Sequence, residues 1–259
     1  MGFGCNAAGV VGCRIIDSER ERLLAVITNS LVPCNGRFPT LISIIAMFFI
    51  GTQTKTLTSL TSALFLTALI LAGIGFTFLS TFILSKTVLK GVPSSFTLEL
   101  PPYRKPQIGK VIVRSVFDRT LFVLGRAAAV AAPAGIIIYL AANITVGDAS
   151  ILKICSDFLD PFARLMGLDG VILIAFILGF PANEIVIPIV IMAYTASGVL
   201  SDTGNLTAVK ELFVSNGWNM TTAMCTMIFS LFHWPCSTTV LTIKKETQSI
   251  KWTVISVLL

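Results

Sequence analysis

The sequence predicts an all-α protein that crosses a membrane several times and contains discontinuous or re-entrant helices. Of its 259 residues, 54% are hydrophobic and only 12% are charged, against roughly 25% charged in average soluble domains. The mean hydropathy is +0.87. One long apolar run, residues 171–200, holds Gly179, Pro181 and a single charged side chain, Glu184. Low charge, long apolar runs and this interrupted run together favour a polytopic membrane protein.

The net charge of +6 requires no nucleic acid partner, because basic residues between apolar runs are typical of cytoplasmic loops. Six cysteines are present, and none forms a C-x-x-C pair. Most lie in or beside apolar segments, so we expect free thiols rather than a zinc site or a disulfide framework. The cysteines are Cys5, Cys13, Cys34, Cys155, Cys225 and Cys236.

The first 50 residues begin with a polar, glycine-rich stretch that predicts a tight turn. Ser18 is a plausible N-cap, with Glu21 at the capping-box position, so residues 20–31 are predicted to form a short amphipathic helix. A second turn is expected at residues 33–37. The apolar run at residues 38–50 has 13 residues, which is short for a span of about 20, so we interpret it as a half-helix or one side of a bent segment.

Residues 56–85 carry no charge and predict one tilted span. Residues 86–119 are basic and are placed in the cytoplasm. Residues 127–142 form most of the next span, which begins near Leu121. Residues 143–169 are acidic on balance and are placed outside.

The last basic cluster bears on the topology of residues 170–200. Residues 212–243 lack Lys, Arg, Asp and Glu and are long enough to span once, ending at Lys244 and Lys245. A single crossing by residues 170–200 would put these lysines outside, against the positive-inside rule. If residues 170–200 instead enter the membrane, break and return to the same side, the basic residues 86–119 and the lysines at 244 and 245 lie on one side of the membrane. We also expect both chain ends to be cut from a larger protein, because a final apolar run stops at Leu259.

Glu184 is the centre of the functional prediction. A carboxylate at bilayer depth costs several kcal/mol unless it is paired or faces water. Gly179 and Pro181 weaken a continuous helix just before it, and broken backbone at this depth is tolerated only when it is buried in protein or lines a cavity. Such a segment is typical of an ion or substrate site in a transporter. The alternative is a Glu paired with an Arg for assembly.

Two short sequence echoes suggest an internal repeat. Residues 2–6 (GFGCN) resemble residues 179–183 (GFPAN), and residues 33–35 (PCN) resemble residues 235–237 (PCS), in the same order. Transporters built from repeats carry broken segments in matching places. We therefore expect two half-sites that face each other.

The candidate ligands combine thiol, imidazole, carboxylate and amide groups. Thiolate and imidazole with one carboxylate suit a borderline divalent metal such as Fe(II) better than Ca²⁺ or Mg²⁺. Cys155 and Cys225 are expected to be packing residues, as is a helical stripe formed by Met220, Met224 and Met227. The candidates are Cys5, Cys34, Cys236, Glu184 and His233 for the metal, with Asn6, Gly179, Pro181 and Asn183 along the substrate path.

These motifs together resemble the FeoB family of ferrous-iron transporters over essentially the whole chain. Residues 4–39 resemble the central conserved region of that family, and residues 100–104 (LPPYR) the loop before its second Gate domain. Residues 179–186 (GFPANEIV) resemble the second Gate motif, although Lys is common where this chain has Asn183. Residues 234–236, 244–247 and 251–252 resemble the last two helices.

The resemblance implies the transport portion of a multi-pass Fe(II) importer in a bacterial or archaeal inner membrane. It implies two Gate-like repeats, with residues 1–119 as the central FeoB_C-like region and 120–259 as a second Gate-like domain truncated in its last helix. The family's proposed iron path matches Cys5, Cys34 and Cys236, with Glu184 nearby. Fe(II) is then the transported substrate, and no bound cofactor is expected.

The same resemblance implies partners beyond the lipid bilayer. They are an N-terminal GTP-binding domain, small Feo accessory proteins and a second copy of the chain. This sequence has no G-x-x-x-x-G-K-[ST] P-loop and no nucleophile–base pair, so we do not expect it to be an enzyme. Two alternatives stay open. One is a Gate-fold permease for a nucleoside or another small solute, and the other is a non-transporting scaffold that docks a separate GTPase through residues 86–119.

Overall fold

The computed structural model is built almost entirely of helices, as expected, and two of them are long and apolar enough to cross a membrane. The structure describes residues 2–49, 55–91, 107, 109–110, 113, 121–146, 149–196 and 206–259. The candidate spans are Glu19–Phe49 and Ser59–Thr87. Most of the basic loop predicted at residues 86–119, including the LPPYR motif, lies outside the described residues.

The N-terminal part is a chain of short helices. It comprises α1 (Asn6–Gly12), η1 (Cys13–Ile15), α2 (Glu19–Thr28), η2 (Asn29–Leu31), η3 (Asn35–Arg37), α3 (Phe38–Ile44) and the π-helical turn η4 (Ile45–Phe49). Ser18 caps α2 by accepting a hydrogen bond from the Glu21 amide. The predicted half-helix after residue 37 is α3 with η4, so the first candidate span is interrupted near its middle.

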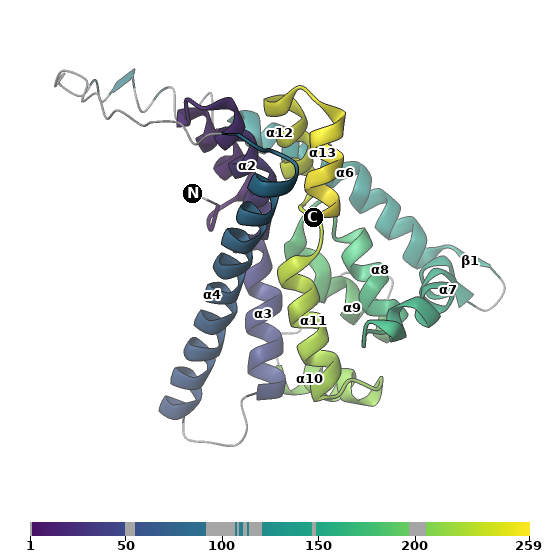
Figure 1. Cartoon of the computed structure of the whole chain (residues 1–259). Helices are drawn as coiled ribbons and strands as arrows, with labels where there is room; N and C mark the ends of the chain where they lie inside the picture. Colours follow the sequence, from purple (N-terminus) through teal and green to yellow (C-terminus); the bar gives the residue numbers. More distant parts are fainter. Residues whose placement is uncertain are drawn as a thin grey trace.

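Two long helices follow the first candidate span. Helix α4 (Lys55–Thr87) matches the span predicted at residues 56–85, and α6 (Phe122–Asn143) matches the next one. Figure 1 shows α4, α3 and α11 running roughly side by side along the molecule. The exposed side chains of α4 and α6 include large apolar residues, for example Phe78 on α4 and Ile136 on α6, as expected for helices surrounded by lipid.

Residues 143–169, which the sequence placed outside on their charge without a predicted secondary structure, contain regular structure. A two-stranded antiparallel ribbon pairs β1 (Thr145–Val146) with β2 (Ala149–Ser150), and α7 (Ile151–Leu165) follows. Helix α7 buries Leu152 and Ala163 but exposes Phe158 and Leu165. Its apolar positions repeat with helical period, and that pattern was hidden by the four aspartates on which the sequence interpretation relied.

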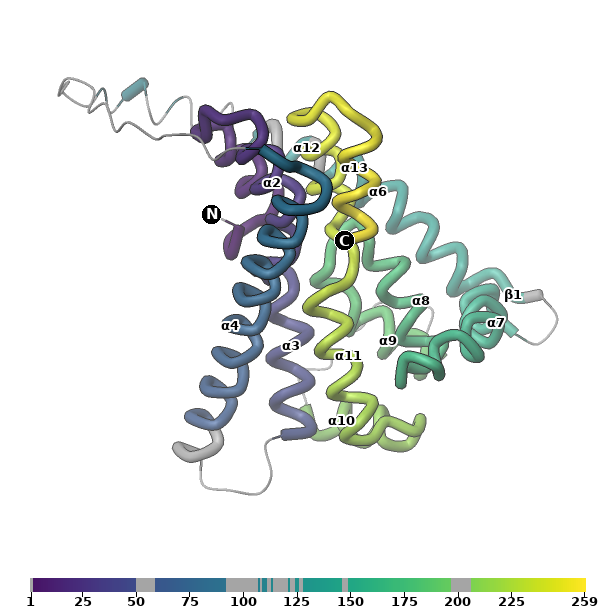
Figure 2. The backbone as a smooth tube through the Cα atoms, in the orientation of Figure 1, coloured from purple at the N-terminus to yellow at the C-terminus, as the bar shows by residue number. Residues whose placement is uncertain are grey.

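The apolar run at residues 171–200 is broken, as predicted. Helix α8 (Gly170–Leu178) meets α7 at an angle of 108°. The backbone then leaves the helical path and resumes through η6 (Asn183–Ile185) and α9 (Val186–Thr195). Helices α8 and α9 pack against each other, and Figure 2 shows how the chain turns back between them. Nine- and ten-residue helices are each about 13–15 Å long, half of what a span needs.

The C-terminal part contains a break that the sequence did not predict as such. Helices α10 (Leu206–Ser215) and α11 (Met220–Phe232) are followed by non-helical residues 233–236, and then by α12 (Ser237–Thr247) and α13 (Ile250–Leu258). Pro235 removes a backbone donor and so ends α11. The uncharged run at residues 212–243 is therefore an interrupted span.

The two ends of the chain meet at one end of the molecule. Helix α1 packs on α12 and α2 on α13. Leu84 of α4 packs in the same small cluster as Trp252. Lys86 in the last turn of α4 and the lysines in the last turn of α12 therefore lie at the same end of the molecule, as the positive-inside rule requires for a re-entrant segment. The main core lies between, where α8, α9, α10 and α11 meet α3.

Candidate functional site

Three breaks in the helices come together in the interior, and we refer to them by number: the 33–37 break, the 179–185 break and the 233–236 break. Each is followed by a helix whose first turn leaves backbone N–H groups without intrahelical partners. Cys34 is the N-cap of η3 and Cys236 is the N-cap of α12. Neither makes a side-chain capping bond. Cys236 precedes the 11-residue α12, whose N-terminal end favours anionic groups.

The 33–37 break lies directly against the 179–185 break. A Cβ atom at Gly36 would lie 3.5 Å from Cγ and 3.6 Å from Oε1 of Glu184, and 3.8 Å from Cβ of Asn183. Glu184 itself is exposed, whereas Asn183 is buried. The 33–37 and 179–185 breaks thus lie close enough that one added methyl group at Gly36 would bring them into van der Waals contact.

Gly179 is needed for close packing within the 179–185 break. A Cβ atom there would lie 2.8 Å from Cγ2 of Val186 and 2.9 Å from the carbonyl oxygen of Ala175, which is too close for any other residue without a shift of backbone. Pro181 follows in the turn, where the Ala182 amide donates to the Gly179 carbonyl over 3.0 Å. These residues shape the turn that carries Asn183 and Glu184.

The 233–236 break is tied to the 179–185 break at two points. The Ser237 amide donates to the Phe180 carbonyl over 2.9 Å. His233 is buried, with Nδ1 2.9 Å from the Ser230 carbonyl and Nε2 3.3 Å from Oδ1 of Asn183. A neutral ring that donates from Nδ1 accepts at Nε2, so Asn183 must turn its amide NH₂ towards the ring. His233 would have to release this contact to bind a metal.

Arg37, which sequence reasoning missed, lies at the centre of this assembly. It is 1% exposed. Nη1 donates to the carbonyls of Ser30 (3.1 Å) and Leu231 (2.8 Å), and Nη2 donates to the carbonyl of His233 (2.9 Å). The Arg37 amide donates to the Cys34 carbonyl over 2.9 Å, and the His233 carbonyl that Nη2 binds lies three residues before Cys236. Arg37 thus links the backbone segments that carry the two cysteines, and the Cys236 thiol lies 3.2 Å from Oγ1 of Thr239.

Three buried polar atoms around these breaks have no hydrogen-bond partner. They are Nε of Arg37, Oγ1 of Thr40 and Oγ of Ser237. Such atoms are rare in protein interiors because leaving one unpaired costs about 1–3 kcal/mol. They lie in η3, in the first turn of α3 and at the start of α12, next to the 33–37 and 233–236 breaks.

Cys5 and Asn6 form a separate part of the predicted site, at the start of α1. Asn6 is buried and accepts, at its backbone oxygen, a 2.8 Å bond from Nδ2 of Asn29. With its amide nitrogen turned inwards, Asn6 donates to the carbonyls of Gly2 (3.0 Å) and Val32 (3.2 Å). Cys5 is the half-buried N-cap of α1. Among the described residues, no group of three or more His, Cys, Asp and Glu side chains is arranged to hold a metal ion.

A second polar network that the sequence did not indicate joins the start of α8, the end of α9 and the connection between α10 and α11. Asp169 caps α8 by accepting from the Ile172 amide over 2.6 Å. The Tyr194 hydroxyl donates to the other carboxylate oxygen of Asp169 and accepts from Nε1 of Trp218 over 2.7 Å. The network fixes the outer ends of α8 and α9, far along both helices from the 179–185 break.

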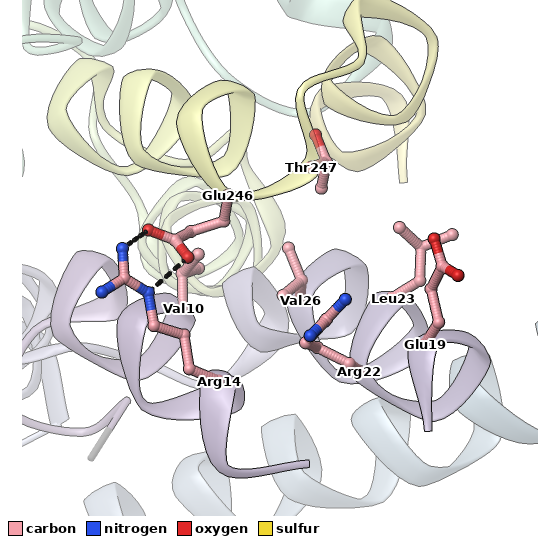
Figure 3. Close-up of a pocket in the computed structure, with 8 residues that line it drawn as sticks. All are labelled: Val10, Arg14, Glu19, Arg22, Leu23, Val26, Glu246 and Thr247. Carbon is pink, nitrogen blue, oxygen red and sulfur yellow. Dashed lines mark hydrogen bonds and ion pairs between the residues drawn. The ribbon is translucent and has the colours of Figure 1, made fainter. Parts of the chain in front are cut away.

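A pocket of about 420 Å³ lies near the basic end of the molecule, away from the three breaks. Figure 3 shows the ion pair on its wall, in which Nε and Nη2 of Arg14 each lie 2.7 Å from a carboxylate oxygen of Glu246. The hydrogen bond and charge of Glu246 raise the pKa of Arg14. The pocket is lined by Val10, Arg14, Glu19, Arg22, Leu23, Val26, Glu246 and Thr247.

Broken helices that meet in the interior, with polar groups at the breaks, define the class of helical membrane transport proteins. Residues 66–119 match the family model described as "Ferrous iron transport protein B C terminus", and residues 121–250 match the Gate model, described as "Nucleoside recognition". The chain belongs to the FeoB family and corresponds to its C-terminal membrane part.

Individual relatives agree with this assignment. The chain is 28% identical over 268 residues to the "Fe(2+) transporter FeoB" of Staphylococcus aureus (strain COL), covering 99% of this chain and 37% of the relative. The proteins of the same name from Leptospira interrogans and Methanocaldococcus jannaschii are 25% and 26% identical, over 96% and 99% of this chain and 38% of each relative. The chain thus spans little more than a third of these relatives. No solved structure matches it.

Proposed function

We propose that this chain forms the membrane path for Fe(II) in a FeoB-type importer of a bacterial or archaeal inner membrane. The observation that carries the proposal is the meeting of the breaks around the buried guanidinium of Arg37, with one thiol at the N-cap of η3 and another at the N-cap of α12. Thiol-rich sites select borderline and soft metals over Mg²⁺ and Ca²⁺. The names of the relatives support Fe(II) as the cargo.

Cys34 and Cys236 are the central ligands in this proposal. Glu184 contributes a hard oxygen ligand at the exposed side, where the 33–37 and 179–185 breaks touch. Cys5 acts at another point of the path, beside Asn6. His233 joins the ligand set only in a state in which it releases Asn183. Successive, incomplete coordination suits transport, because a site that holds its ion too tightly cannot let it leave.

Gly179, Pro181, Asn6 and Asn183 shape the path rather than bind the metal strongly. The proposed movement is a separation of the 33–37 break from the 179–185 break, which would expose the thiols to alternate sides in turn. Energy coupling is assigned to a GTP-binding domain on a longer chain or a separate one. Small Feo accessory proteins and a second copy of the chain are further proposed partners.

The test is entry of Fe(II) into vesicles under anaerobic, reducing conditions, with the chain alone and joined to the GTP-binding region of a relative. We expect Cys34→Ser and Cys236→Ser each to lower entry by about tenfold or more, as the loss of a metal contact does. Glu184→Gln should lower it less. Cys155→Ser is the matched control, because Cys155 is exposed on α7. Unchanged entry in all three site variants would contradict the thiol path.

A nucleoside or similar solute is the second candidate substrate. The description of the Gate model and the hydrogen-bonding character of Asn183, His233 and Glu184 favour it. The same vesicles decide between the two substrates. Nucleoside entry that depends on Asn183 and Glu184, but not on Cys34 or Cys236, would replace the iron proposal.

A further inference from the structure

The three carbonyls that hold Arg37 lack their ordinary helical partners for reasons visible in the sequence. The intrahelical partner of the Leu231 carbonyl would be the amide of residue 235, but Pro235 has no N–H. The His233 carbonyl would bond the amide of Ser237, which is used by Phe180 instead. Ser30 lies in η2, and the 3-10 partner of its carbonyl would be the amide of residue 33, but Pro33 has no N–H.

These carbonyls form a cage for a cation. Two of them lie at the C-terminal end of α11, where the helix dipole is negative. In transporters with broken helices, freed carbonyls at such ends are where small coupling cations bind. Here the guanidinium of Arg37 fills the cage and is almost completely shielded from solvent. A charged side chain buried at this depth is costly unless such groups compensate it.

We propose that Arg37 is a tethered cation. It occupies the position that a mobile monovalent cation would otherwise take, and so holds the 33–37 break against the 233–236 break without a coupling ion. Arg37 is thus a positioning residue for the two thiols on either side of it. The inference concerns the site of the proposed iron path, but it rests on the carbonyl geometry and not on the identity of the cargo.

The test is chemical rescue of Arg37→Ala, measured as the thermal unfolding midpoint of the full chain in lipid nanodiscs. The variant should unfold at a lower temperature than the wild type. Guanidinium at concentrations far below those that denature proteins should raise its midpoint saturably towards the wild-type value, as ligand binding to a folded state does. Separate arms with Na⁺ and K⁺, against N-methylglucamine at equal ionic strength, show which inorganic cation enters the cage.

Arg20→Ala is the matched control. Arg20 also donates to carbonyls at a helix end, those of Leu89 (2.5 Å) and Ser85 (3.3 Å) near the end of α4, but it is only half-buried. Water can replace its guanidinium, so no saturable rescue is expected. The proposal would be overturned if none of the cations raised the unfolding midpoint of Arg37→Ala. It would also be overturned if the cations raised the midpoint of Arg20→Ala by the same amount.

Two further variants cover the case in which Arg37→Ala does not fold. Arg37→Lys keeps the charge, and Arg37→Met keeps much of the volume without it. A higher unfolding midpoint for the Lys variant supports the tethered cation, and an equal or higher midpoint for the Met variant overturns it. Because unfolding and not iron entry is measured, a wild type that transports no iron would refute the proposed function and leave this test intact.

Discussion

Gly36 lies against Glu184, so that a single Cβ atom would bring the 33–37 break into contact with the carboxylate-bearing side chain of the 179–185 break. The relationship joins residues almost 150 positions apart. It places the exposed carboxylate of the second break beside the polar turn that follows Cys34. The fit of these two turns is therefore open to a simple steric test.

Enlarging Gly36 should separate the two turns. In Gly36→Ala the new atom makes ordinary contacts of 3.5–3.8 Å, so we expect near wild-type Fe(II) entry and stability. In Gly36→Leu the side chain must displace Glu184 and Asn183, with an overpacking cost of about 1–3 kcal/mol and a clear loss of entry. Vesicle uptake and thermal unfolding measure both effects. Wild-type uptake by the Leu variant would show that the two turns need not touch.

The contact between His233 and Asn183 should behave as one coupled unit. A double-mutant cycle with His233→Ala and Asn183→Ala measures the coupling in the free energy of unfolding. We expect about 1 kcal/mol, the usual net contribution of a buried hydrogen bond. Strictly additive effects of the two substitutions would mean that the 3.3 Å approach is not a stabilising bond.

Tyr194→Phe should destabilise the ends of α8 and α9. The hydroxyl serves both Asp169 and Trp218, so its removal leaves an oxygen of the half-buried Asp169 and the indole N–H of the buried Trp218 short of a partner, at about 1–3 kcal/mol. Tyr139→Phe is the control, because Tyr139 is 60% exposed and should change stability little. Equal unfolding midpoints for the two variants would contradict a structural role for the network.

Cys13 should be slow to alkylate at neutral pH. Burial, followed by the charge of Glu246, raises the pKa of this thiol above its ordinary value, and only the thiolate is reactive. The rate should therefore rise at a higher pH than for an ordinary cysteine. Because the folded state holds the proton more tightly, this group contributes stability below the ordinary thiol pKa and loses it as pH rises through the folded value.

The variant Glu246→Gln tests the effect of this carboxylate on the alkylation rate of Cys13. Removing the carboxylate takes away one cause of the raised pKa and leaves the Arg14 charge unpaired nearby. Alkylation of Cys13 at neutral pH should become faster, while that of the exposed Cys155 should not change. A slower rate at Cys13 would show that the sign of the electrostatic effect is wrong.

The sequence predicted the breaks better than it predicted what joins them. Gly179, Pro181 and one carboxylate in an apolar run indicate a break through purely local effects. The role of Arg37 was not predictable in this way, because its partners are backbone carbonyls 194 and 196 residues away. Any residue type can supply a carbonyl, so no pattern of side chains marks such a cage.

Helix α7, in the acidic stretch before α8, was not predicted for a different reason. Asp157 and Asp160 lie on one side of α7, while Phe158 and Leu165 lie on an exposed apolar side. Charges were counted over residues 143–169 to place them outside, and this count averaged the two sides together. The helical period is present when each position is considered separately. Asp169 was counted only as one acidic charge, whereas it caps α8 and bonds Tyr194.

The most direct test of the central claim, that Cys34 and Cys236 line one metal path, is metal protection of their thiols. The wild-type protein in vesicles is treated with a membrane-permeant alkylating reagent, with and without Fe(II), under anaerobic conditions, and each cysteine is quantified by mass spectrometry. We expect Fe(II) to slow alkylation of both Cys34 and Cys236 and to leave Cys155 unchanged. Alkylation of Cys34 and Cys236 at the same rate with and without Fe(II) would contradict the account.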